Sequence, residues 1–268
     1  MDVSKLNAET FFDLDSFDHS SLFENCHYVW EGLRKTKGYL EHHLKANVTA
    51  VGYFRQPLPQ TVLLWRGRIW REGYDFLGGD VTKGTFRLRI LDEEVGDAAV
   101  LYAGSILWDE QIYLGSGSVV EPGALIQGPT IIGAQTEVRQ GAYVRGNCII
   151  GDRCVVGHTT EIKGSVMLND AKAGHFAYIG DSILGNATNL GAGSKLANLK
   201  IKPGTVRIKT GADWLDTGLR KFGAVLGDHV EIGCNAVTNP GTLLGKGCRV
   251  FPVTSVPSGY HEPESIVR

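Results

Sequence analysis

A six-residue hydrophobic repeat begins at residue 114. Small residues recur four places after the aliphatic ones, and glycine often follows the aliphatic position directly. A period of six fits neither the alternation of a strand nor the turn of a helix, but it is typical of a coil in which each hexad is a short strand and a turn. We therefore predict a β-helix with three hexads per turn and a core of stacked aliphatic side chains. The aliphatic series is Leu114, Val120, Ile126, Ile132, Val138, Val144, Ile150, Val156, Ile162 and Leu168.

The aliphatic series stops at two places. The first interruption follows Leu168 and contains His175, where we expect the inward aliphatic register to fail. Because a repeat builds a scaffold, a departure from its rule is the first place to expect chemistry. After the first interruption the series resumes at Leu184, Leu190 and Leu196, and after the second it closes with Leu226, Ile232 and Leu244.

The first hundred residues follow other patterns. Apolar residues at three- and four-residue steps predict an amphipathic helix over residues 21–35. Short apolar runs predict strands over residues 48–53, 61–70 and 85–91. We therefore expect an accessory α+β segment, which can cover one open end of the β-helix. The predicted organisation is residues 1–105 for this segment, 106–258 for the β-helix and 259–268 for a C-terminal tail.

Composition narrows the classes of function. The 35 glycines among 268 residues are about twice the average share, which indicates many tight turns. A formal net charge of -2 argues against a general binder of nucleic acid or of anionic membranes. We find no signal peptide and no apolar run long enough to cross a membrane. The five cysteines form no CxxC pair, which favours a reducing cytoplasm over a disulfide framework or a zinc site.

Polar side chains cluster in sequence around His175. A neutral imidazole can remove a proton near neutral pH, and cations on successive coils can hold a phosphate. Amide and phenol groups can fix sugar hydroxyls or an oxyanion. A lone histidine on such a coil is more often a surface residue, but the surrounding groups favour a functional site. They are Arg145, Lys163, Tyr178, Asp181, Asn189 and Asn198.

The repeat resembles the left-handed β-helix of the hexapeptide-repeat acyltransferases. Members of that family are generally homotrimers with active sites between neighbouring prisms. The run GHFAYIGDSILGNATNLGAGSKLANL is similar to the acetyltransferase domain of the bifunctional enzymes that make UDP-N-acetylglucosamine. Together with DTGLRKFGAVLGD at residues 216–228, it is still more similar to the C-terminal part of archaeal-type sugar-1-phosphate nucleotidylyltransferases. The likeness covers about residues 110–258.

The resemblance implies a role for each matching residue. His175 of the HxxYxGD motif would be the general base, and Asn189 would complete the catalytic set. The implied reaction is acetyl transfer from acetyl-CoA to the amino group of glucosamine 1-phosphate, without a protein nucleophile. A basic residue that grips CoA in the family is replaced by Ser258. The implied sugar-phosphate contacts are Arg145, Lys163, Tyr178, Asn189 and Asn198, and the implied acetyl-CoA contacts are Ala192, Cys234 and Cys248.

Residues 1–110 contain neither the Gly-rich phosphate loop nor the PK motif of a nucleotidylyltransferase domain, so we expect no such activity in this chain.

Two other functions are alternatives to acetyl transfer. A non-catalytic sugar-phosphate-binding or assembly subunit, partnering a separate nucleotidylyltransferase, is the main alternative. A γ-class carbonic anhydrase would need two histidines five residues apart and a third one, a spacing that His158, His175 and His229 do not supply.

A basic loop over residues 200–222 fills the second interruption. It is either a solvated surface loop or a segment that folds over a neighbouring subunit and helps to hold phosphates. Trp214 would then be a packing anchor. The cations of this loop are Lys202, Arg207, Lys209, Arg220 and Lys221.

Overall fold

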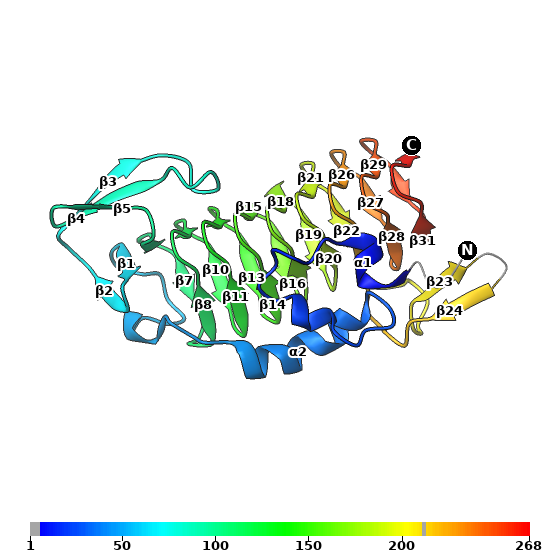
Figure 1. The fold of residues 1–268 in the computed structure, drawn as a ribbon, viewed down its shortest axis with the longest axis horizontal. Coiled ribbons are helices and arrows are strands. Elements are labelled where there is room, and N and C mark those ends of the chain that lie inside the picture. The colour runs from blue at the N-terminus through cyan, green and yellow to red at the C-terminus, as the bar shows by residue number, and fades with distance from the viewer. Residues whose placement is uncertain (1–5, 211–212) are drawn as a thin grey trace.

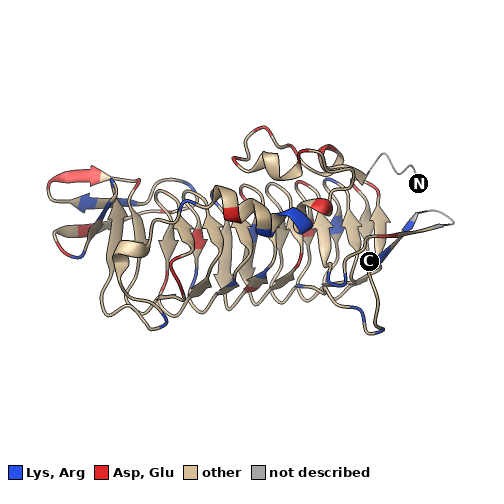
Figure 2. Cartoon of the chain, turned by 90° about the horizontal axis from the view of Figure 1, so that it is seen from below, with Lys and Arg blue, Asp and Glu red and all other residues tan. Residues whose placement is uncertain are grey.

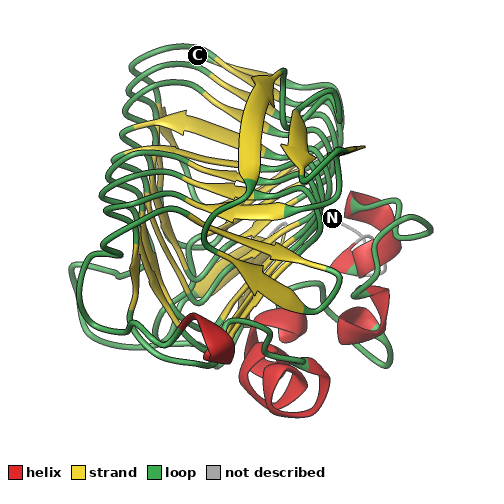
Figure 3. Cartoon of the chain, turned by 90° about the vertical axis from the view of Figure 1, so that its left-hand side faces the viewer, coloured by secondary structure: helices red, strands yellow, loops and turns green. Residues whose placement is uncertain are grey.

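The computed structural model describes residues 6–210 and 213–268. Its main body is a triangular prism of short parallel strands, and the coil makes about 9 turns in the described residues (Figures 1 and 3). This confirms the predicted fold class, a mainly β, left-handed parallel β-helix. Among the described residues, no helix is long and apolar enough to span a bilayer.

Three parallel sheets form the faces of the prism. The first face contains β6 (Ala99–Leu101), β9 (Val119–Val120), β12 (Glu137–Val138), β15 (Val155–His158), β18 (Lys172–His175), β21 (Asn189–Leu190), β26 (Glu231–Ile232), β29 (Arg249–Val250) and β32 (Ile266–Val267). The second face contains β7 (Ile106–Leu107), β10 (Leu125–Gln127), β13 (Tyr143–Arg145), β16 (Glu161–Lys163), β19 (Tyr178–Gly180), β22 (Lys195–Leu196), β27 (Val237–Thr238) and β30 (Ser255–Val256). The third face contains β8 (Ile112–Leu114), β11 (Thr130–Ile132), β14 (Cys148–Ile150), β17 (Val166–Met167), β20 (Ile183–Leu184), β25 (Ala224–Leu226), β28 (Thr242–Leu244) and β31 (Gly259–His261).

The strand register corrects the predicted series at the first interruption. Ile150 pairs with Met167, and Met167 pairs with Leu184, so Met167 takes the core position. Leu168 instead packs on the outside of the prism. Ala173 and Ile179 occupy the next two core positions. The coil is therefore continuous here. Two intervals between successive core positions, from Ile162 to Met167 and from Ile179 to Leu184, are simply one residue shorter than the usual six.

The N-terminal segment covers the third face (Figure 3). It contains α1 (Ala8–Phe11), the 3-10 helix η2 (Ser20–Phe23), α2 (Glu31–His43) and the 3-10 helix η3 (Thr49–Val51). The predicted helix over residues 21–35 is wrong in its bounds, because Asn25 adopts a left-handed conformation, with φ of 57°, between η2 and α2. Buried aromatic side chains of the segment lie against outward-facing aliphatic residues of the third face, which are Ile131, Ile149, Val166, Ile183, Val225 and Leu243.

Antiparallel strands close the N-terminal end of the prism. β1 (Val62–Trp65) pairs with β2 (Arg68–Trp70) and with β6, so the predicted strand over residues 61–70 is a hairpin. β3 (Tyr74–Gly78), β4 (Arg87–Ile90) and β5 (Glu93–Val95) form a separate sheet that projects from this end (Figure 1). The stretch predicted as a strand over residues 48–53 instead contains η3.

The coil extends beyond both of its predicted boundaries. β6 pairs with β9 in parallel, so coiled structure begins before residue 106. At the other end β28 pairs with β31, and β29 pairs with β32. Residues 259–268 therefore continue the first and third faces instead of forming the expected tail. The structure gives no separate boundary at residue 258.

Candidate active site

The predicted base, His175, lies on the ridge where the first face turns into the second. β18 ends at His175, and strand pairing places His158 of β15 directly beside it. The next residue, Phe176, has a left-handed φ of 53° and is 54% exposed. Its ring lies 5.4 Å from the ring of His158 and 6.0 Å from that of His175, measured between centroids. A bulky residue rarely adopts this conformation, so the ridge holds an exposed aromatic ring in a strained position beside two imidazoles.

The two ridge histidines have different surroundings. Nδ1 of His158 lies 3.0 Å from the carbonyl oxygen of Gln140. Because a carbonyl only accepts, Nδ1 carries the proton in this contact, and Nε2 is left as the acceptor of the neutral ring. The ring of His175 is exposed and contacts Phe176.

Residues 6–210 and 213–268 contain no group of three histidine, cysteine or carboxylate side chains able to hold a metal ion.

Two of the three predicted acetyl-CoA contacts lie on the same ridge as His175. The register of β18, β21, β26 and β29 aligns His175 with Ala192, Cys234 and Pro252 on successive coils. We call these four residues, together with His158, the His175 ridge. Backbone hydrogen bonds connect its coils, from Gly193 N–H to the His175 carbonyl (3.0 Å), from Asn235 to Ala192 (2.8 Å) and from Val253 to Cys234 (2.9 Å).

The third predicted acetyl-CoA contact, Cys248, is not on this ridge. Cys248 is buried where the third face turns into the first. Its Sγ lies 3.1 Å from the carbonyl oxygen of Glu262 and 3.2 Å from Oγ of Ser265. The structure therefore does not bring Cys248 together with Ala192 and Cys234, and its contact with acetyl-CoA stays a prediction. Pro252, one full turn of the coil after Cys234, takes the corresponding position on the His175 ridge.

A polar network joins four predicted site residues on the second face. Nζ of Lys163 lies 2.6 Å from Oδ2 of Asp181, and Nδ2 of Asn198 donates to the same carboxylate oxygen. The hydroxyl of Tyr178 lies 3.4 Å from Oδ1 of Asn198. The network is half-buried, which limits its screening by water. It holds a phenol, an amide and a cation at fixed positions beside one another.

Both predicted phosphate-binding cations already have a carboxylate partner. Nη1 of Arg145 lies 2.6 Å from Oε1 of Glu161, and this hydrogen bond raises the pKa of Arg145 above its ordinary value. Lys163 pairs with Asp181 as described above. Strand pairing places Arg145 and Lys163 on adjacent coils of the second face. A bound phosphate would therefore share these cations with two carboxylates.

Asn189 lies apart from the other predicted sugar contacts. It begins β21 on the first face, where its Nδ2 donates to Oε2 of Glu231 at 3.0 Å. Tyr178 and Asn198, by contrast, belong to the network on the second face. One chain therefore does not bring Asn189 together with that network. The HxxYxGD motif runs around the ridge from His175 to Asp181, and so its residues face two directions.

A family model describes more than half of this chain. Residues 126–266 match the model described as GMPPB C-terminal domain. The chain belongs to this family. The match includes every residue predicted for the site, from Arg145 to Cys248.

Curated relatives of this GMPPB C-terminal domain family member are bifunctional proteins. The chain is 35% identical over 100 residues to the bifunctional sugar-1-phosphate nucleotidylyltransferase/acetyltransferase of Sulfurisphaera tokodaii, covering 37% of this chain and 25% of that protein. It is 31% identical over 157 residues to the bifunctional protein GlmU of Methylibium petroleiphilum, covering 59% of this chain and 30% of that protein. These matches confirm the predicted resemblance, and the chain spans about a quarter to a third of the length of these relatives.

Two solved acetyltransferase structures align with part of this chain at low similarity. One is the acetyltransferase domain of PglB from Neisseria gonorrhoeae in complex with acetyl coenzyme A, with 13% identity, a TM-score of 0.27 and coverage of 62% of this chain and 55% of that one. Another is the polysialic acid O-acetyltransferase OatWY, with 14% identity, a TM-score of 0.30 and coverage of 58% and 79%.

The buried thiols of this family member should be inert, whereas Cys234 on the ridge should react. Burial raises the pKa of Cys148 and of Cys154 to about 12, so both stay protonated in the prism core. Cys234 is exposed. Iodoacetamide at pH 8 should therefore label Cys234 in the native protein and should label the two core thiols only after unfolding, as read by peptide mass mapping. Rapid native labelling of Cys148 would contradict the core register.

Proposed function

We propose that this chain is an acetyl-CoA-dependent N-acetyltransferase that acts on an amino-sugar 1-phosphate. Glucosamine 1-phosphate is the first candidate acceptor. The observation that carries the proposal is the juxtaposition of His175 on an exposed ridge with the Lys163–Asp181–Asn198–Tyr178 network on the adjoining face. The relative from Sulfurisphaera tokodaii supports the proposal, because that protein is named as a nucleotidylyltransferase/acetyltransferase.

His175 would act as the general base. The neutral amine of the acceptor attacks the thioester carbonyl, a C–N bond forms, and the proton leaves the amine for the imidazole. Collapse of the tetrahedral intermediate breaks the C–S bond, and the CoA thiolate takes up the proton. Backbone N–H groups or the amide of Asn189 would stabilise the oxyanion. None of the five cysteines is needed as a nucleophile.

The second face would hold the sugar phosphate. Arg145 and Lys163 lie on adjacent coils, at a spacing that suits the oxygens of one phosphate group. Tyr178 and Asn198 would hydrogen-bond to sugar hydroxyls. Glu161 and Asp181 hold both cations in place before the substrate arrives, which reduces the side-chain entropy lost on binding.

A homotrimer would complete the site. Asn189 and the second-face network point to different sides of one prism, so a single sugar would contact both only across two chains. The N-terminal segment covers the third face, which leaves the first and second faces free to meet a neighbour. Exposed apolar side chains on the ridge, Phe176 and Val253, would be covered there. Light scattering should therefore give three times the mass of one chain.

An acceptor panel tests the proposed substrate class. CoA release should be fastest with glucosamine 1-phosphate and slower with glucosamine 6-phosphate and with glucosamine. Lys163→Met should raise KM for the amino-sugar phosphate about tenfold or more, because a charge-assisted hydrogen bond is lost. KM for acetyl-CoA should not change. The matched control is Lys37→Met, which removes an exposed cation of α2, away from the first and second faces.

One outcome of the same panel would favour a different function. If no amino sugar supports CoA release but glucosamine 1-phosphate binds in calorimetry, the chain is a non-catalytic sugar-phosphate-binding or assembly subunit that partners a separate nucleotidylyltransferase. The observation that favours this second candidate is Ser258, which stands where the resemblance implies a basic residue that grips CoA.

A further inference from the structure

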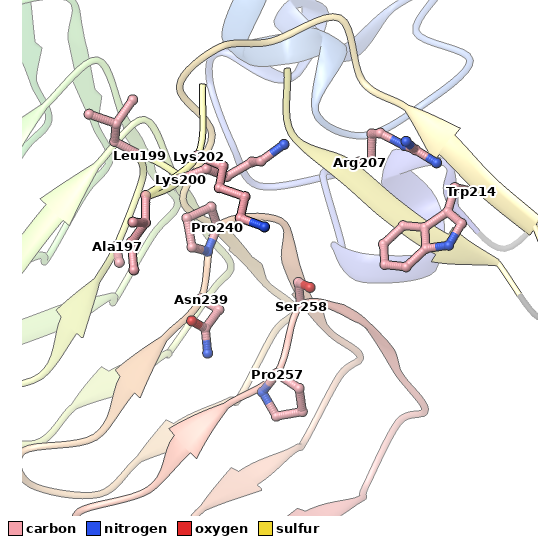
Figure 4. A pocket seen from close by; sticks show the side chains of 11 residues that line it. Ala197, Leu199, Lys200, Lys202, Arg207, Trp214, Asn239, Pro240, Pro257 and Ser258 are labelled. Atoms are coloured by element: carbon pink, nitrogen blue, oxygen red, sulfur yellow. The ribbon is translucent and has the colours of Figure 1, made fainter. Parts of the chain in front are cut away.

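The basic loop of the second interruption forms a hairpin that leaves a large groove. β23 (Arg207–Thr210) and β24 (Asp213–Asp216) pair in an antiparallel manner and project from the edge between the second and third faces (Figures 1 and 2). A cavity of about 820 Å³ lies between this hairpin and the prism (Figure 4). That volume falls within the range of sites for small ligands. Lys200, Lys202, Arg207 and Trp214 line it from the insertion, and Asn239 and Ser258 line it from the prism.

The groove carries positive charge. Lys200, Lys202 and Arg207 contribute cations, and none of the lining residues that the structure describes is acidic. In the ion pairs formed among the described residues, none of these three cations takes part. Lys200 donates to the carbonyl oxygen of Thr205. The nearby carboxylate of Asp216 is held by Thr205 and by the backbone of Gly218. Lys202 and Arg207 are thus available to an anionic ligand.

An exposed aromatic ring lies beside these cations. Trp214 is 51% exposed, and the guanidinium carbon of Arg207 lies 5.4 Å from the centre of its ring. Figure 4 shows both side chains on the hairpin side of the groove. A flat ring of this kind can stack on a nucleobase, and such a stack contributes about 1–3 kcal/mol in nucleic-acid complexes. The groove thus combines a stacking surface with cations that suit phosphates.

The groove also adjoins the proposed sugar-phosphate site. The pairing of β16, β19 and β22 aligns Lys163 with Gly180 and then with Ala197, which lines the groove. Two coils of a β-helix separate Lys163 from Ala197, a distance of roughly 10 Å at the usual strand spacing. Ser258 also lines this groove, and the cations that line it come from the hairpin insertion, namely Lys200, Lys202 and Arg207.

We propose that the hairpin groove binds a nucleotide, with its base on Trp214 and its phosphates against Lys202 and Arg207. Two kinds of ligand carry this chemistry, the nucleotide end of CoA and the nucleoside diphosphate of a sugar nucleotide. The proposal does not depend on acetyl transfer, because binding is measured without turnover.

Calorimetry with adenosine 3′,5′-bisphosphate, UDP and ribose 5-phosphate tests the groove. At least one of the two nucleotides should bind, whereas ribose 5-phosphate, which has no base, should bind more weakly. Trp214→Ala should weaken nucleotide binding about tenfold or more. Arg207→Gln should weaken it and reduce its salt dependence. The matched control, Arg68→Gln, removes an exposed cation at the other end of the prism and should leave binding unchanged.

A second set of titrations identifies the source of the nucleotide. If Trp214→Ala weakens acetyl-CoA binding, the groove takes the nucleotide end of CoA. If it weakens only UDP-N-acetylglucosamine binding, the groove takes a sugar nucleotide. Trp214→Phe should keep nucleotide binding while abolishing any ligand-induced quenching that arises from Trp214. The proposal is overturned if neither nucleotide binds at millimolar concentration, or if Trp214→Ala leaves binding as tight as in the wild type.

Discussion

Replacing His175 by alanine should lower kcat for acetyl transfer about 10²-fold or more. A positioned general base typically contributes a factor of this size, because the amine must lose a proton as it attacks the thioester. His175 is exposed on a ridge that also carries Ala192 and Cys234, two of the three residues expected to contact acetyl-CoA. KM for the amino-sugar phosphate should change little, because Arg145 and Lys163 remain in place.

Two control histidines make this result specific. His42 is exposed on α2, which runs along the third face, and His42→Ala should leave kcat unchanged. His158 stands beside His175 with its Nδ1 bonded to a backbone carbonyl, so its Nε2 is also free to accept a proton. If His158→Ala removes activity and His175→Ala does not, the base is His158, and the assignment of His175 is wrong.

Replacing Trp30 by alanine should lower the free energy of unfolding by about 3–5 kcal/mol, the usual cost of truncating a large buried aromatic residue. Trp30 is 1% exposed and stacks on Tyr28, with ring centroids 4.7 Å apart. Its ring also lies 6.1 Å from that of Phe222, at the end of the basic loop. It therefore fastens the N-terminal segment to the prism and to the base of the hairpin insertion.

Urea denaturation measures this loss, and a second tryptophan controls for the change of residue type. Trp108 is 40% exposed and has the guanidinium of Arg55 over its ring, so Trp108→Ala should cost about 1 kcal/mol or less. Trypsin should also cleave α2 of the Trp30 variant earlier, at Lys35 and Lys37. Equal destabilisation by the two substitutions would contradict the clamping role of Trp30.

The β-helix could be predicted from the sequence, but its register around residue 168 could not. A count in steps of six reaches Leu168, whereas the core position is Met167. Both residues are apolar because the third face is buried on both sides, by the core and by the N-terminal segment. Neighbouring positions on that face therefore do not alternate between apolar and polar, and a step shortened by one residue leaves no mark in the pattern.

The motif identified the site residues better than it identified their arrangement. Lys163, Asp181, Asn198 and Tyr178 do form one network, although nothing in their spacing reveals that the cation is already paired. Their division between two faces depends on where the chain turns a corner, which the pattern does not mark. The groove beside Trp214 depends on how the insertion folds back, and local propensity does not specify such long-range packing.

The most direct test of the proposed function follows the acetyl group itself. Acetyl-CoA labelled with ¹³C in its acetyl group is incubated with glucosamine 1-phosphate, and the sugar product is analysed by NMR and mass spectrometry. We predict an amide that carries the label on the amino sugar, with one CoA thiol released for each amide formed. Unchanged amino sugar beside intact acetyl-CoA, at a protein concentration that binds both, would contradict it.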